Sequence, residues 1–168
     1  MSNAFESQIL PSVQKMYRYA LSLVKDQDTA HDVVQDCLEK IWKKRSTLEQ
    51  IHQPEAWAMR ITRNQCLDWF KVNRYDLPVN DQMQVSDNRQ AGGDVEATDQ
   101  LQWLEIVLEG FTNKQKEVFQ LRDVEGFTYQ EIAEILSITV DDVKVTLHRT
   151  RKSLKQKMIK INEYGIAN

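Results

Sequence analysis

Apolar residues recur three and four positions apart along most of the chain, and strictly alternating apolar and polar runs are missing. The first spacing follows one face of an α-helix, whereas a half-buried strand has a period of two. The pattern stops after residue 75, where a Pro, a Gly-Gly pair and many Asn, Asp and Ser residues appear. We therefore predict an all-α fold of two small helical domains, 1–75 and 101–168, joined by a flexible linker over 76–100.

The second predicted domain marks the starts of its helices. Two pairs fit the capping box that satisfies free N–H groups, Thr112 with Gln115 and Thr128 with Glu131, and Thr139 with Asp142 is a near match. Gly110 and Gly126 stand where the preceding segments should end. The expected helices cover 101–109, 113–123, 129–136 and 140–160.

Only Ser137, Ile138 and Thr139 separate the last two of these helices. A short helix, a tight turn and a second helix form a helix-turn-helix, which places its second helix in the DNA major groove. One stripe of the second helix is predicted to face the core: Val140, Val143, Leu147, Thr150, Leu154, Met158 and Ile161. The other side is polar and basic and could face DNA. A helical hairpin in a protein-interaction domain is the alternative interpretation.

Charge is distributed unevenly. The formal net charge is −3, yet residues 148–168 carry six Lys and Arg against one Asp or Glu, while residues 76–109 carry one against eight. Positive charge thus lies where the second helix would meet phosphates, and acidity elsewhere limits indiscriminate binding. The linker is predicted to be acidic as well as flexible.

The first domain contains a helix with an acidic and amide face. In "DVVQDCLEKIWKK" the side predicted to be buried holds Val33, Val34, Cys37, Leu38, Ile41 and Trp42. The side predicted to be exposed holds Asp32, Gln35, Asp36, Glu39 and Lys43. Such a face could bind a partner or could simply be solvated.

The next predicted helix begins near Pro54, a residue suited to a first helical position. Its predicted inward side chains are Trp57, Ile61, Leu67 and Trp69. Its outward face is polar and partly basic: Arg60, Arg63, Asn64, Asp68, Lys71 and Arg74. Cations interleaved with aromatic rings suit single-stranded nucleic acid, because rings stack on unpaired bases and cations hold the backbone.

Several classes of function lack their residues. No stretch approaches the roughly 20 apolar residues that span a bilayer, and the N-terminus has no secretory-signal layout, so we expect a cytoplasmic protein without stable membrane insertion. Cys37 and Cys66 are predicted to be buried free thiols. We expect no metal and no cofactor. A nucleic-acid-processing enzyme would need a general base, nucleophile or metal cluster, and since none is recognisable we expect no enzyme.

Three segments together resemble the bacterial RNA polymerase sigma factors of the sigma-70 family, extracytoplasmic-function type. They are "DVVQDCLEKIWKK", "AWAMRITRNQCLDWFK" and "FTYQEIAEILSITVDDVKVTLHRTRKSLK", in the family's order. The resemblance implies that residues 1–75 are sigma region 2, a helical bundle, and that 101–168 are sigma region 4, a helix-turn-helix domain. It also implies a specificity subunit that binds core RNA polymerase and directs promoter-specific transcription initiation.

The resemblance further implies roles for particular residues. Contact with the clamp helices of the polymerase largest subunit is expected from Asp32, Gln35, Asp36 and Glu39. Recognition and melting of the −10 element is expected from Trp57, Arg60, Arg63, Asn64, Asp68 and Lys71, with Trp57 supporting the loop from Ser46 to Gln53. Recognition of the −35 element is expected from Lys144, Val145, Thr146, His148, Arg149, Arg151 and Lys152. The second domain would bind the polymerase flap.

Two further expectations concern partners. The resemblance implies promoter DNA as the target and an anti-sigma factor that covers the polymerase-binding faces. A stand-alone helix-turn-helix regulator that binds duplex DNA is the alternative. It accounts for residues 110–160 equally well, but it gives no role to the face around Gln35 or to the 60–71 stretch.

Overall fold

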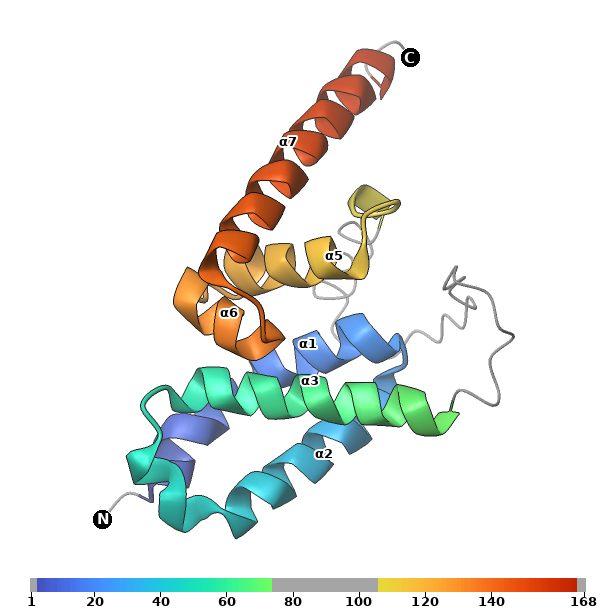
Figure 1. Ribbon diagram of the computed structural model, residues 1–168. Coiled ribbons are helices and arrows are strands. Elements are labelled where there is room, and N and C mark those ends of the chain that lie inside the picture. Colours follow the sequence, from blue (N-terminus) through green and yellow to red (C-terminus); the bar gives the residue numbers. More distant parts are fainter. Residues whose placement is uncertain (1–2, 74–105, 166–168) are drawn as a thin grey trace. The chain divides into compact units, whose positions relative to one another are not determined.

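A computed structural model describes residues 3–73 and 106–165 of the chain. Every regular element within these ranges is a helix, which confirms the predicted all-α class (Figure 1). The chain divides into two compact units, and each is described by itself. The predicted linker over 76–100 and most of the predicted helix over 101–109 lie outside the described residues. The domain boundaries at 75 and 101 stay a prediction.

The first domain is a bundle of three α-helices with short helical segments around them. Its elements are η1, a π-helix (Phe5–Ile9), η2, a 3₁₀-helix (Leu10–Ser12), α1 (Val13–Val24), α2 (Gln27–Lys43), η3, a 3₁₀-helix (Arg45–Gln50), and α3 (Pro54–Asn73). Helix α1 packs on both α2 and α3, which also pack on each other. The sequence pattern predicted α2 and α3 but made no statement about η1, η2 or α1.

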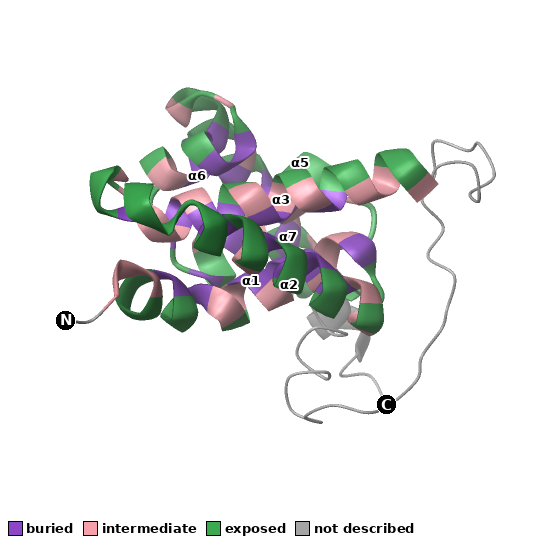
Figure 2. Cartoon of the chain, turned by 90° about the horizontal axis from the view of Figure 1, so that it is seen from below, coloured by how far each residue is buried: buried purple, intermediate pink, exposed green. Residues whose placement is uncertain are grey.

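Apolar side chains fill the interior of this bundle. Figure 2 shows in purple which parts of its helices are buried. The largest fully buried side chains of the bundle are Ile9, Met16, Tyr19, Ile41, Leu48 and Met59. Cys37 and Cys66 are buried as free thiols, as predicted. Because the bundle buries one side of α2 and one side of α3, the opposite sides remain available to partners.

The predicted burial of Trp42 and Leu67 is wrong. Trp42 is 42% exposed, and instead of entering the core its ring forms a T-shaped pair with Phe5, at a centroid distance of 5.1 Å. Leu67 is 36% exposed. The interior side of α3 consists of smaller or unbranched side chains, which let neighbouring helices approach closely: Ala56, Ala58, Met59, Thr62 and Cys66.

A sharp turn joins α1 to α2. Lys25 ends α1 in the left-handed region, with φ of 61°, and its N–H donates to the carbonyl of Leu21 at 2.9 Å. Asp26 then caps α2, because its carboxylate accepts from the Thr29 N–H at 2.9 Å and from the Thr29 hydroxyl at 2.7 Å. These bonds lower the pKa of Asp26.

The second domain contains α5 (Asn113–Phe119), η5, a π-helix (Gln120–Val124), α6 (Tyr129–Leu136) and α7 (Val140–Gly165). Helix α5 packs on α7. The predicted helix over 113–123 is correct in position, but its last part has π geometry. The predicted α6 and the start of α7 match the structure.

All three predicted capping pairs form. Thr112 and Gln115 exchange side-chain and backbone bonds at 2.9 and 3.2 Å, and Thr128 and Glu131 do the same at 2.8 and 3.2 Å. Thr139 accepts from the Asp142 N–H at 3.1 Å. Since each cap satisfies N–H groups that the helix leaves free, the caps determine where α5, α6 and α7 begin.

The turn between α6 and α7 needs a left-handed residue. Ser137 occupies that position with φ of 55°, although glycine takes it at lower cost. Gly110 and Gly126, with φ of 88° and 79°, hold comparable positions earlier in the domain. The backbone turn therefore follows the helix-turn-helix geometry that its length predicted.

The core of the second domain lies on the predicted stripe of α7 and on α6. The buried residues of α7 are Val143, Leu147, Thr150 and Leu154, and those of α6 in the same unit are Ile132 and Ala133. The stripe ends earlier than predicted, because Met158 is 43% exposed and Leu154 is the last buried residue within 140–160. The side chain of Ile161 lies outside the described residues.

Candidate nucleic-acid interface

The acidic and amide face of α2 is exposed as predicted. Asp32, Gln35, Asp36 and Glu39 all lie on the solvent side of the helix. Glu39 forms an ion pair with Lys43 one turn later, at 2.7 Å. The hydrogen bond from Lys43 lowers the pKa of the Glu39 carboxyl. The face therefore presents carboxyl groups and an amide, which suits a partner surface with basic and hydrogen-bonding groups.

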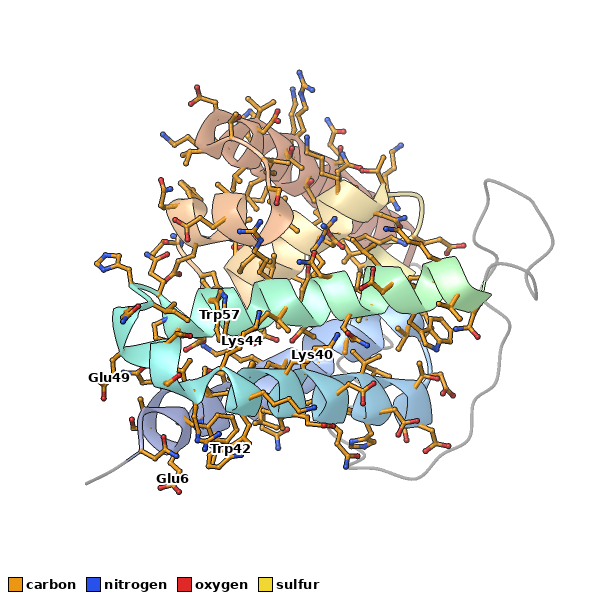
Figure 3. All side chains as sticks on the ribbon, turned by 60° about the horizontal axis from the view of Figure 1, so that its bottom comes forward. Glu6, Lys40, Trp42, Lys44, Glu49 and Trp57 are labelled. Carbon is orange, nitrogen blue, oxygen red and sulfur yellow. The ribbon has the colours of Figure 1, made fainter. Side chains whose placement is uncertain are left out.

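The end of α2 is basic, a feature that the sequence interpretation did not use. Lys40 donates to the Gln65 side chain on α3. Figure 3 shows Lys40 and Lys44 on the side of α2 toward α3, whereas Trp42 points away from α3. Residues four positions apart lie on one side of a helix, so the spacing of Lys40 and Lys44 in the sequence is enough to predict that they share a side.

The outward face of α3 brings most of its predicted residues together. Arg60, Asn64, Asp68 and Lys71 are exposed and recur about one turn apart, and Trp57 and Arg63 are half-buried. Arg74 lies outside the described residues. Trp57 lies in the first turn of α3, and its N–H donates to the carbonyl of Gln53, the residue just before the helix, at 3.0 Å. The face offers cations, an amide and a partly exposed indole within one helix.

The outward face of α7 is also largely as predicted. Lys144, Val145, His148, Arg149 and Lys152 are exposed, and Thr146 is half-buried. The side chain of Thr146 lies closer to the core because it is one turn from the buried Val143 and Thr150, and its carbonyl accepts from the Thr150 hydroxyl at 2.7 Å. A helix with an exposed basic face and a buried apolar stripe can enter a DNA groove.

Arg151 differs from the other basic residues of α7. Its Nε donates to Oδ2 of Asp123 at 3.0 Å, and its Nη2 donates to Oδ1 of the same carboxylate. This bonding raises the pKa of the Arg151 guanidinium. The sequence interpretation missed Asp123, which is 28 residues away and has no periodic relation to Arg151.

The start of α7 carries the two acidic residues Asp141 and Asp142. Both are exposed, and Asp142 lies 3.7 Å from the ammonium of Lys114 on α5. Carboxylates near a helix N-terminus are stabilised by the helix dipole. The basic face of α7 therefore begins one turn after the acidic start, at Lys144.

Residues 3–73 and 106–165 contain no group of three or more His, Cys, Asp or Glu residues that could hold a metal ion. None of their helices combines the length and the apolar character needed to cross a membrane.

Comparison with known protein families matches both domains. The family described as Sigma-70 region 2 matches residues 11–75, and the family described as Sigma-70, region 4 matches residues 101–154. The two regions occur in that order in one chain. Together they cover both the α2–α3 surfaces and the helix-turn-helix.

Individual relatives agree with these matches. The ECF RNA polymerase sigma factor SigX of Bacillus subtilis (strain 168) is 24% identical over 160 residues, covering 89% of this chain and 81% of its own. The RNA polymerase sigma factor SigV of the same organism is 29% identical over 150 residues, covering 88% and 86%. The chain belongs to the sigma-70 family. Within that family it is of the extracytoplasmic-function type.

A solved structure has the same fold. It is the sigma factor RpoE in complex with the anti-sigma factor NepR from Bartonella quintana. The TM-score is 0.71 at 25% identity, and the alignment covers 95% of this chain and 99% of the other.

Proposed function

We propose that this chain is a promoter-specificity subunit of bacterial RNA polymerase. It binds the core enzyme and directs transcription initiation at particular promoters, without catalysing a reaction itself. The observation that carries the proposal is the presence, on one chain, of both matched sigma regions, each with an exposed face of suitable chemistry. This activity places the protein in the cytoplasm, where the polymerase and the chromosome are.

Contact with the polymerase is assigned to the acidic and amide face of α2. Asp32, Gln35, Asp36 and Glu39 are exposed together, so they can meet a helical partner without rearrangement of the bundle. The partner is the pair of clamp helices of the largest subunit, and the second domain binds the flap. Complementary charges across such an interface favour fast association and the correct partner.

Recognition of the melted −10 element is assigned to α3. Arg60 and Lys71 supply positive charge for the backbone, and Asn64 can bond to the exposed edges of unpaired bases. Trp57 is half-buried, so it is suited to support the segment from Ser46 to Gln53, most of which is η3, rather than to stack freely. Arg63 and Asp68 complete the proposed face.

Recognition of the duplex −35 element is assigned to α7. Arg149 and Val145 lie one turn apart on the exposed face of the helix, where base edges would be met. Lys144, Thr146, His148 and Lys152 flank them and can bond to phosphates or sugars. Base reading and backbone anchoring are thus divided between different residues of one helix.

An anti-sigma factor is proposed as the regulatory partner. The RpoE structure contains the anti-sigma factor NepR, and its fold aligns with nearly the whole of this chain. Covering the α2 face would block the proposed polymerase contact, so a bound inhibitor would keep the chain inactive until it is released.

The stand-alone regulator is a weaker candidate, because it leaves the match of residues 11–75 to sigma region 2 without a function. Transcription in vitro with purified core polymerase separates the two. A sigma factor should bind core enzyme and start transcription at specific promoters from a genomic library. Binding to duplex DNA without any association with core enzyme would favour the stand-alone regulator.

A further inference from the structure

Arg149 and Arg151 lie on different sides of α7. Two positions along an α-helix correspond to about 200° of rotation, so their side chains leave the helix in nearly opposite directions. Arg149 lies on the exposed face, whereas the Arg151 guanidinium bonds to both carboxylate oxygens of Asp123 in η5. Arg151 is therefore directed toward its own domain.

A second arginine, Arg122, makes contacts in the same part of the domain. The guanidinium of Arg122 lies 4.8 Å from the centre of the Tyr129 ring and donates to the Phe127 carbonyl at 2.8 Å. Arg151 also interacts with Tyr129, the first residue of α6. These contacts join the π-helical segment η5, the start of α6 and the middle of α7.

We propose that Arg151 is a positioning residue, which through Asp123 sets the rotation of α7 so that Arg149 reaches a base edge. This inference rests on the proposed function, since it requires α7 to enter the −35 element. It gives Arg151 a role different from that of its neighbour Lys152.

The geometry of the pair supports this role. A guanidinium that makes two parallel bonds to one carboxylate fixes direction as well as distance, which a lysine cannot do. Asp123 also neutralises Arg151, so a DNA phosphate would have to displace an existing partner. Lys152 is exposed, and its single ammonium lacks the planar two-bond geometry of a guanidinium.

The expected effect is moderate. The side chains are 48% exposed for Arg151 and 26% exposed for Asp123, so water screens the pair in part. We expect Arg151→Ala to weaken binding of the full chain, assembled with core polymerase, to a matching −35 duplex by about three- to tenfold. The variant should discriminate less between bases, while the salt dependence of its binding should stay the same.

The test uses −35 duplexes that the wild-type holoenzyme selects from a random pool, with single-base variants of them, at several salt concentrations. Arg151→Ala and Asp123→Ala should each reduce discrimination at the base position that Arg149→Ala also relaxes. The salt slope should stay unchanged. The double variant should be no weaker than either single variant, because the two residues act as one unit.

Two matched variants separate position from charge. Lys152→Ala should flatten the salt slope by about 0.9 while keeping base discrimination, as expected for a phosphate contact. Arg151→Lys keeps the charge but not the two-bond geometry, so it should still lose discrimination. If Arg151→Ala lowers helicity by circular dichroism, Arg151→Lys and Asp123→Asn make the same comparison.

Other results would overturn the proposal. If Arg151 anchors a phosphate, Arg151→Ala flattens the salt slope by about one unit and leaves base discrimination intact. In that case Asp123→Ala would tighten binding, because it frees the guanidinium for DNA. If the wild-type holoenzyme selects no −35 sequence at all, the proposed function fails together with this inference.

Discussion

Arg149 and Lys152 are close neighbours on the exposed face of α7, but replacing each of them should affect DNA binding in a different way. An arginine that makes two bonds to guanine discriminates by roughly 1–3 kcal/mol, whereas a lysine on phosphate is blind to sequence. Arg149→Ala should therefore relax preference at one −35 position with little change in salt slope. Lys152→Ala should weaken all promoters alike.

A panel of −35 substitutions measured at two or more salt concentrations checks this prediction. Uniform loss in both variants, or intact base preferences in Arg149→Ala, would contradict it. Lys155→Ala is a useful comparison, because Lys155 is exposed and lies one turn beyond Arg151 on the same helix.

Cys37 provides a prediction about reactivity. Burial raises the pKa of its thiol to about 11, against the bonds and charges that lower it, including a hydrogen bond with Thr62. The ordinary value is 9.0, so the thiolate fraction at neutral pH should be about a hundredfold smaller than in the unfolded chain. Alkylation by iodoacetamide should therefore proceed only as fast as the protein opens.

The raised pKa of the Cys37 thiol also makes stability depend on pH. A thiol pKa that is higher in the folded state favours folding fully below about pH 9, and this contribution is lost as pH rises toward 11. The urea-unfolded chain, alkylated at the same pH, gives the reference rate. Rapid labelling of Cys37 under native conditions would contradict the prediction.

Individual side chains were predicted unevenly from the sequence. The exposed residues of α2 and α7 follow helical periodicity, which depends only on spacing. Trp42 was misplaced because its ring packs against Phe5, and Phe5 lies in a segment whose sequence has no periodic pattern. The pairing of Arg151 with Asp123 could not be predicted either, because it depends on how η5 packs against α7.

The exposed face of helix α2 should provide the contact with the polymerase. Asp36→Arg reverses a charge in the middle of its exposed face, so we expect affinity for core polymerase to fall by at least about tenfold. Helicity should not change, because a charge on an exposed face contributes little to folding. Titration of labelled core enzyme with the variant measures the effect.

Glu6→Arg is the matched control, since Glu6 is also exposed but lies on η1. Equal affinities of Asp36→Arg and the wild type would remove this face from the assignment. Equal losses in both variants would point to net charge rather than to a specific contact.

Elements with capping signals were predicted best. Thr112, Thr128 and Thr139 marked the starts of α5, α6 and α7, because a cap bonds to N–H groups only a few residues away. The π-helical segments η1 and η5 were not predicted, since a wider helical turn has no distinct residue pattern. Packing around them decides their form.

At the scale of the whole molecule, the two domains should act on different steps. Asn64→Ala on α3 should lower open-complex formation more than closed-complex binding, because unpaired bases appear only after melting. Arg149→Ala on α7 should lower closed-complex binding, since the −35 element stays double-stranded. Permanganate footprinting together with filter binding distinguishes the steps.

The double variant extends this test. Because the residues belong to different domains and act on different steps, their effects on open-complex yield should add. Equal loss at both stages in Asn64→Ala would indicate simple phosphate anchoring by α3.

The helical class of both domains was predictable from periodicity, whereas their partners came from motif resemblance and not from spacing.

The π-helix at Gln120–Val124 makes the chain sensitive to insertions and deletions there. The phase of the segment depends on its residue count, because a π-turn holds one residue more than an α-turn. In an α-helix each residue adds about 100° of rotation, so one residue inserted before Asp123 would turn its carboxylate away from Arg151. Inserting one alanine between Arg122 and Asp123 should therefore leave helicity nearly unchanged and still lower −35 discrimination. In this segment the number of residues, as well as their identity, carries information for promoter choice.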